Sequence, residues 1–261
     1  KGENKSIWKR SYANDLGRLA QGVGNRIEGT NTIFFIPKSA VPSNKRVTYG
    51  KKECTLRPNK SKVYRNRLTV SRDKLIYNRD TATQCASLTT AKLLLNSTIS
   101  TPGARFRCID IKNMYYGTPM SDYEYMKIKY SKILQEIIDE YNLDEIVVKD
   151  GYVYMEIRKG MPGLKQAGKI ANDCLTKHLD KYGYRPCPHT PALWRHESRD
   201  VTFALVVDHF GVKYKGVENF RHLCSALRDL YKITVDEQGT KFLGLSIKWN
   251  YKAGWVEISM P

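Results

Sequence analysis

Two aspartates follow strand-like segments of this 261-residue chain, and together they could bind a metal ion. Residues 203–210 have the sequence Phe-Ala-Leu-Val-Val-Asp-His-Phe, which predicts a buried strand that turns at Asp208 and His209. Residues 106–111 alternate as Phe-Arg-Cys-Ile-Asp-Ile, so Asp110 lies near the end of a second predicted strand. Mg²⁺ prefers oxygen ligands, and two such strands side by side would bring both carboxylates to one site.

Aspartates at strand ends are also common turn and cap residues. The neighbouring residues are therefore needed to distinguish a metal site from ordinary turns. Segment 109–117, I-D-I-K-N-M-Y-Y-G, resembles the first catalytic segment, D-V-K-x-A-F-L-x-G, of reverse transcriptases from Ty/copia-type retrotransposons. In the same order along the chain, three more segments resemble that family's Y-G-L-K-Q-A-P, Y-V-D-D and F-L-G-I-x-I motifs: 163–167, 205–209 and 242–247. Four motifs in the family's order are a specific signal.

The resemblance continues upstream, more loosely. Segment 62–70, K-V-Y-R-N-R-L-T-V, is similar to the R-Y-K-A-R-L-V strand of the family's fingers, and Trp8 with segment 32–37 fits its W…W-x-L-V-x-x-P opening. The resemblance implies an α+β fold of fingers and palm, in which helices back an antiparallel palm sheet. The fingers would occupy residues 1–80, and the palm with part of the fingers residues 81–261.

The family's chemistry implies a role for each matched position. Asp110, Asp208 and the backbone carbonyl of Ile111 would bind two Mg²⁺ ions, which promote attack of a primer 3′-hydroxyl on an incoming dNTP. Tyr115 would pack against the deoxyribose of that nucleotide. The resemblance implies that the triphosphate is bound by Arg65 and Arg67. The templating pair and the incoming nucleotide would contact Pro162, Gly163, Lys165 and Gln166. The primer would be supported by Phe242, Leu243 and Gly244.

Each of these substrate-binding positions also has a purely structural interpretation. Tyr115 fits a core aromatic residue, and Arg65 and Arg67 fit solvated charges on a strand. Residues 163–166 fit an ordinary loop ahead of a helix, and residues 242–244 fit a strand with a tight glycine contact. The sequence leaves these alternatives open.

Three positions depart from the family's motifs. His209 stands where the family has a second aspartate, and an imidazole is a poor ligand for Mg²⁺ and brings no negative charge. Pro162 replaces a tyrosine and lacks a backbone donor, and Gly168 replaces a proline. We therefore expect the fold and nucleic-acid affinity to persist while polymerisation is weak or absent.

Three functional classes follow from these matches and departures. The first is an RNA-directed DNA polymerase that acts on a primed RNA or DNA template, and the second is an inactive remnant that keeps a basic nucleic-acid-binding fold. The third, an unrelated two-metal nuclease, would need a denser acidic cluster around Asp110 than the sequence contains.

Composition agrees with a nucleic-acid partner. The 44 Lys and Arg residues exceed the 26 Asp and Glu residues and give a formal charge of +18, which favours binding to a polyanion.

No apolar stretch reaches the roughly 18 residues of a membrane span, so we expect a soluble intracellular protein without a membrane partner. The six cysteines form no C-x-x-C pair and are expected to be reduced. Because the chain starts at Lys1 and ends soon after the last motif, we expect it to be part of a longer pol polyprotein, and we expect neither a thumb nor an RNase H within residues 1–261.

Hydrophobic periodicity predicts the elements that would position these residues. Strands at 45–50 and 62–70, joined by a loop that contains residues 57–60, would form a projecting fingers hairpin. Residues 83–97 predict a helix with Leu93, Leu94 and Leu95 on its buried side. Further helices are expected at 133–141, 170–182 (ending at Gly183) and 217–231, and a strand at 152–157. The helices would lie behind a sheet whose open face carries the acids.

Overall fold

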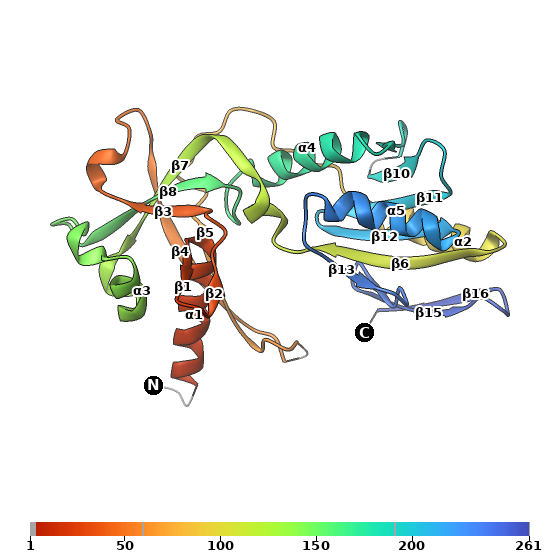
Figure 1. Cartoon of the computed structure of the whole chain (residues 1–261), viewed down its shortest axis with the longest axis horizontal. Helices are drawn as coiled ribbons and strands as arrows, with labels where there is room; N and C mark the ends of the chain where they lie inside the picture. Colours follow the sequence, from red (N-terminus) through yellow and green to blue (C-terminus); the bar gives the residue numbers. More distant parts are fainter. Residues whose placement is uncertain (1–3, 59, 191, 261) are drawn as a thin grey trace. The chain divides into compact units, whose positions relative to one another are not determined.

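The computed structural model describes residues 4–58, 60–190 and 192–260, and in these ranges the chain has a mixed α+β fold with five α-helices and several sheets. It divides into two compact units, each made of two separate stretches of the chain. Figure 1 colours these stretches by residue number. Unit 1 comprises Lys1–Thr81 and Tyr115–Ala171, and unit 2 comprises Ala82–Met114 and Asn172–Pro261. No helix within the described ranges is both long enough and apolar enough to cross a membrane.

Unit 1 is built around a sheet with the strand order β3-β8-β7-β4-β5. Neighbouring strands are antiparallel except β4 and β7, which are parallel. The strands have these bounds: β3 Ile33–Ile36, β4 Val47–Leu56, β5 Tyr64–Val70, β7 Pro119–Lys129 and β8 Tyr152–Lys159. Shorter elements complete the unit: β1 Gly22–Val23, β2 Ile27–Glu28, and 3₁₀ turns at Lys38–Ala40, Tyr130–Lys132 and Leu143–Glu145.

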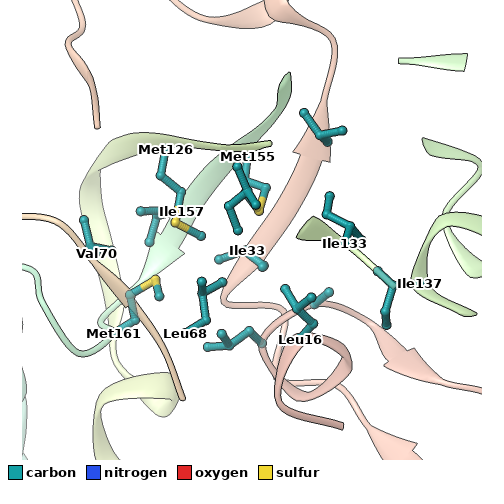
Figure 2. Close-up of a cluster of buried hydrophobic side chains, with 14 of the residues drawn as sticks. Leu16, Ile33, Leu68, Val70, Met126, Ile133, Ile137, Met155, Ile157 and Met161 are labelled. Atoms are coloured by element: carbon teal, nitrogen blue, oxygen red, sulfur yellow. The ribbon is translucent and has the colours of Figure 1, made fainter. Parts of the chain in front are cut away.

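Alternating side chains from one face of this sheet form the core of unit 1. Ile33, Leu68 and Met155 are fully buried there, each on a different strand. They meet Leu16 of α1 (Lys5–Leu19) and Ile137 of α3 (Gln135–Glu140), as Figure 2 shows. Burial of such side chains, worth about 1.5–3 kcal/mol each, holds the two helices against the sheet.

Helix α1 also satisfies hydrogen-bonding groups at the free edge of β5. The Asn66 N–H donates to the Ser11 hydroxyl at 3.0 Å, and the Leu68 N–H donates to the Asp15 carboxylate at 2.7 Å. An unpaired edge strand presents such groups to other chains, so these helix side chains take the place of a further strand.

Unit 2 contains an antiparallel sheet with the strand order β13-β6-β12-β11-β10-β9. The strands have these bounds: β6 Ala104–Ile111, β9 Tyr184–Pro186, β10 Leu193–His196, β11 Val201–Val206, β12 His209–Lys215 and β13 Ile233–Asp236. A second sheet consists of β14 Lys241–Phe242, β15 Leu245–Asn250 and β16 Trp255–Ser259. The helices are α2 Leu88–Ser100, α5 Val217–Arg228, and α4 Ala167–Asp180, which begins in unit 1.

The two faces of the unit 2 sheet are covered by different elements. On one face, Arg107 lies over the ring of Phe220 in α5. On the other face, which carries Asp110, the Phe106 ring contacts Phe242, and Lys213 donates to the hydroxyls of Ser97 in α2 and of Thr101 directly after it. The face that carries the acids is therefore not open along its length, in contrast to the expectation, because α2 and β14 cover the part away from Asp110.

Most predicted elements are present, with shifted ends. The predicted hairpin is formed by β4 and β5, although Asn59 of its loop lies outside the described residues. The helix predicted at 83–97 begins only at Leu88, because the Ser87 hydroxyl caps it by accepting the Thr90 N–H. The prediction that Leu93 is buried is wrong: its side chain is 64% exposed, and the helical repeat buries Leu94 and Leu95 instead.

The other expected elements also lie near their predicted positions. The strand expected at 152–157 is β8, and the helices expected at 170–182 and 217–231 are α4 and α5. The helix expected at 133–141 is shorter, because α3 contains only Gln135–Glu140.

Candidate metal centre

Two neighbouring strands of unit 2 place Asp110 and Asp208 at one end of the sheet. Strand β12 pairs with β6 in a register that sets His209 opposite Asp110. Strand β12 also pairs with β11, so that Val207 and Asp208 form the turn of the hairpin. The Ile111 N–H donates to the Asp208 backbone carbonyl at 2.9 Å and fixes this turn beside the end of β6.

The side chains of Asp110, Asp208 and His209 converge at this point. One carboxylate oxygen of each aspartate and one ring nitrogen of the histidine all lie within 4.8 Å of one another. The Nδ1 atom of His209 is 3.1 Å from an Asp110 oxygen, and Nε2 is 3.7 Å from an Asp208 oxygen. The side chains of Asp110, Asp208 and His209 are 44%, 35% and 55% exposed, so a ligand can reach them from solvent.

The hairpin turn holds Val207 in an unfavourable conformation. Its φ of 58° lies in the left-handed region, which β-branched residues rarely adopt. Glycine is the favoured residue at the first position of a hairpin turn with this sign of φ. The pairing of β12 with both neighbouring strands keeps the turn in place despite the strain.

The donor set does not fit a pair of Mg²⁺ ions. Mg²⁺ selects hard oxygen ligands in octahedral geometry, and one of the three converging side chains offers nitrogen instead. Both ring nitrogens of His209 also face the carboxylates, so the histidine competes with any cation for their oxygens. Two carboxylates and an imidazole are better suited to one transition-metal ion than to two magnesium ions.

The predicted primer-supporting residues form a turn in unit 2. Phe242 ends β14, and Leu243 and Gly244, with φ of 53° and 78°, connect it to β15. A Cβ atom added to Gly244 would meet nothing within 4 Å, so glycine suits this position through its φ and not through a close contact. The close contact belongs to Gly211, where an added Cβ would lie 2.7 Å from the Phe242 ring.

Arg65 and Arg67 lie on β5 in unit 1 and are both half-buried. Burial lowers the pKa of Arg65, and the positive charge of Arg67 lowers this pKa further. Burial also raises the pKa of Asp15, while the Leu68 N–H and the charges of Arg18 and the two strand arginines oppose this rise. These arginines therefore form a concentrated positive group around a buried acid.

The loop predicted to lie under the templating pair packs tightly against β5. The Val70 N–H donates to the Pro162 carbonyl at 2.9 Å, and Gly163 has a φ of 102°. A Cβ atom added to Gly163 would lie 2.1 Å from the Val70 carbonyl oxygen. Lys165 is exposed, whereas Gln166 is buried and donates from Nε2 to the Glu124 carboxylate at 3.0 Å.

The predicted steric residue Tyr115 is half-buried and packs against the core of unit 1. The converging donors belong to unit 2, whereas Tyr115, the arginines of β5 and the loop at 162–166 belong to unit 1. The structure therefore brings Asp110, Asp208 and His209 together, and the contacts predicted between the other residues and a nucleotide stay predictions. The role predicted for the Ile111 carbonyl also stays a prediction.

Sequence reasoning missed Asp15 and Glu124, the buried acids that support these segments. Asp15 stabilises the β5 edge, and Glu124 accepts the hydrogen bond from Gln166. Burial raises the pKa of Glu124, and the Gln166 hydrogen bond opposes this rise. Neither acid lies in a recognisable motif, and the sequence offered no signal for them.

A search of protein-family models finds none that matches this chain.

Proposed function

We propose that the chain is the fingers and palm portion of a copia-type RNA-directed DNA polymerase whose metal centre is impaired by His209. It binds a primed template and adds dNTPs weakly or not at all. The observation that carries the proposal is the convergence of Asp110 and Asp208. These are the two acids that the sequence motifs single out, they are far apart in the chain, and the register of β6 with β12 brings them together.

The expected impairment follows from the position of His209. Its imidazole contacts both carboxylates and supplies no negative charge to balance two dications. Loss of one of three carboxylates would weaken metal binding and the alignment of the triphosphate together. An inactive remnant is the limiting case of the same proposal, in which this impairment is complete.

Nucleic-acid affinity is expected to survive this change, because it depends on other residues. The formal charge of +18 favours contact with phosphates whether or not the metal centre works. The half-buried arginines of β5 and the exposed Lys165 are candidates for such contacts in unit 1.

Binding and extension measured on one substrate test the proposal. A labelled poly(rA)/oligo(dT) duplex should bind the chain with a Kd in the micromolar range or tighter at physiological salt. In the presence of Mg²⁺ and dTTP, extension should be absent or should exceed the level of the Asp110→Asn variant only slightly. Absence of binding would overturn the nucleic-acid half of the proposal, and robust extension by the chain as it stands would overturn the impaired metal centre.

A further inference from the structure

The sheet of unit 1 has a second face, opposite the hydrophobic core, that gathers tyrosines and lysines. Along β8, Val153 and Met155 point into the core, and so Tyr152 and Tyr154 lie on the second face. The same alternation places Lys127 of β7 on this face, because its neighbour Met126 is in the core. We call this surface the tyrosine–lysine face; it comprises Lys38, Tyr49, Lys74, Lys127, Tyr152 and Tyr154.

Strand register aligns the central residues of this face in one row. Tyr49 of β4 pairs with Lys127 of β7, and Lys127 pairs with Tyr154 of β8. The Lys127 ammonium lies 4.2 Å from the ring centroid of Tyr152, 5.5 Å from that of Tyr49 and 5.6 Å from that of Tyr154. A cation over a ring face is attracted by the ring quadrupole, so these contacts fix the lysine among the tyrosines.

Two further lysines approach the same rings from segments beside the sheet. The Lys74 ammonium lies 4.6 Å from the ring centroid of Tyr49, and the Lys38 ammonium lies 5.8 Å from that of Tyr154. Both lysines are exposed, whereas Tyr49 and Tyr152 are half-buried and Tyr154 is buried. Within the described part of the chain, Lys38 and Lys127 form no ion pair with a carboxylate.

We propose that the tyrosine–lysine face binds single-stranded nucleic acid. Bases would stack against Tyr49 and Tyr152, and phosphates would contact Lys38, Lys74 and Lys127. The inference rests on the nucleic-acid partner of the proposed function and is independent of the metal centre in unit 2.

The chemistry of this face favours an unpaired strand over other anionic partners. Lysines alone would attract an acidic peptide or an anionic membrane equally well. Tyrosine rings among lysines match a strand that alternates aromatic bases with phosphates, and stacking on them tolerates any base sequence. Paired bases inside a duplex are already stacked on each other and cannot reach the rings.

Fluorescence anisotropy with a labelled oligouridylate of about 20 nucleotides tests this inference. The double variant Tyr49→Leu/Tyr152→Leu should weaken binding by about tenfold or more, while Tyr49→Phe/Tyr152→Phe, which keeps the rings, should bind within about twofold of the unmodified chain. Lys127→Gln should weaken binding and should reduce the slope of log affinity against log salt concentration by about the value of one phosphate contact. The matched control Lys181→Gln, an exposed lysine of unit 2, should do neither.

Circular dichroism of each variant separates lost binding from lost folding. Binding by a folded leucine variant within about twofold of the unmodified chain would overturn the inference, as would equal competition by polyglutamate or by phosphatidylserine vesicles. A chain that binds the primed duplex but not the oligouridylate would overturn this inference and leave the proposed function standing. Tyrosine-dependent binding of the oligouridylate would support this inference even where robust primer extension overturned the impaired metal centre.

Discussion

At the proposed metal centre, His209 would change one donor atom. It replaces an oxygen donor of the family's motif by nitrogen, and its two ring nitrogens lie 3.1 and 3.7 Å from the oxygens of Asp110 and Asp208. A second departure, in the loop that is predicted to bind substrate, is milder in structural terms. Pro162 contributes its carbonyl to the Val70 N–H, and this hydrogen bond does not need the donor that proline lacks.

Gly163 leaves no room for a side chain in the folded structure. Gly163→Ala should lower the free energy of unfolding by about 2–4 kcal/mol, because the new Cβ would collide with the Val70 backbone while φ stays at 102°. Urea denaturation followed by tryptophan fluorescence measures this loss.

Gly151→Ala is the matched control for that substitution. Gly151 has a φ of 75°, but an added Cβ would meet nothing within 4 Å. Its substitution should therefore cost only about 1–2 kcal/mol, the usual penalty for a left-handed alanine. Equal losses for the two variants would show that the contact with β5 is unimportant.

At the scale of elements, the packing of α1 along the edge of β5 depends on a buried acid. Burial raises the pKa of Asp15 above its ordinary value of 3.8, although the Leu68 N–H and the neighbouring arginines oppose the rise. A carboxyl group with a raised pKa in the folded state binds its proton more tightly there than in the unfolded chain. Its contribution to stability is thus complete below the ordinary pKa and is lost as the pH rises through the raised value.

Asp15→Asn should remove this part of the pH dependence. The amide oxygen can still accept the Leu68 N–H but does not titrate, so the stability of the variant relative to the unmodified chain should increase as the pH rises from about 4 towards 7. Thermal unfolding of both proteins at several pH values measures the difference. A difference that stays constant, or that decreases with rising pH, would contradict the raised pKa.

The elements themselves were largely predictable, because apolar periodicity reports which face of a segment is buried. The alternation at 152–157 and the apolar run at 203–206 correctly predicted β8 and β11. Element ends were less predictable, since the Ser87 cap starts α2 five residues later than the apolar pattern suggested. A cap acts through one hydrogen bond, which hydrophobic periodicity does not detect.

The candidate site was predictable only in part, for a related reason. Motif order identified Asp110 and Asp208, and the strand register brought them together with His209. The buried acids Asp15 and Glu124 act through contacts between segments that are 53 and 42 residues apart in sequence. Such long-range pairs leave no local pattern, so they emerge only from the folded structure.

At the scale of the whole molecule, the excess of positive charge should dominate binding to nucleic acid. With a formal charge of +18, association with an unpaired strand should release counterions from each phosphate contacted. If three phosphates are contacted, the affinity should fall by about tenfold or more when the salt concentration rises from about 50 to 200 mM. Anisotropy titrations across this range measure the slope, and an affinity insensitive to salt would contradict a binding mode based on lysine and arginine.

Primer extension by the His209→Asp variant tests the metal centre most directly. This change restores a third carboxylate beside Asp110 and Asp208 without altering the strands that position them. With Mg²⁺ on poly(rA)/oligo(dT), the variant should extend the primer at least about tenfold faster than the unmodified chain, and adding Asp110→Asn should abolish the gain. Extension that stays at the level of the unmodified chain, in a folded variant that still binds the primed template, would contradict the assignment of His209 as the cause of the impairment.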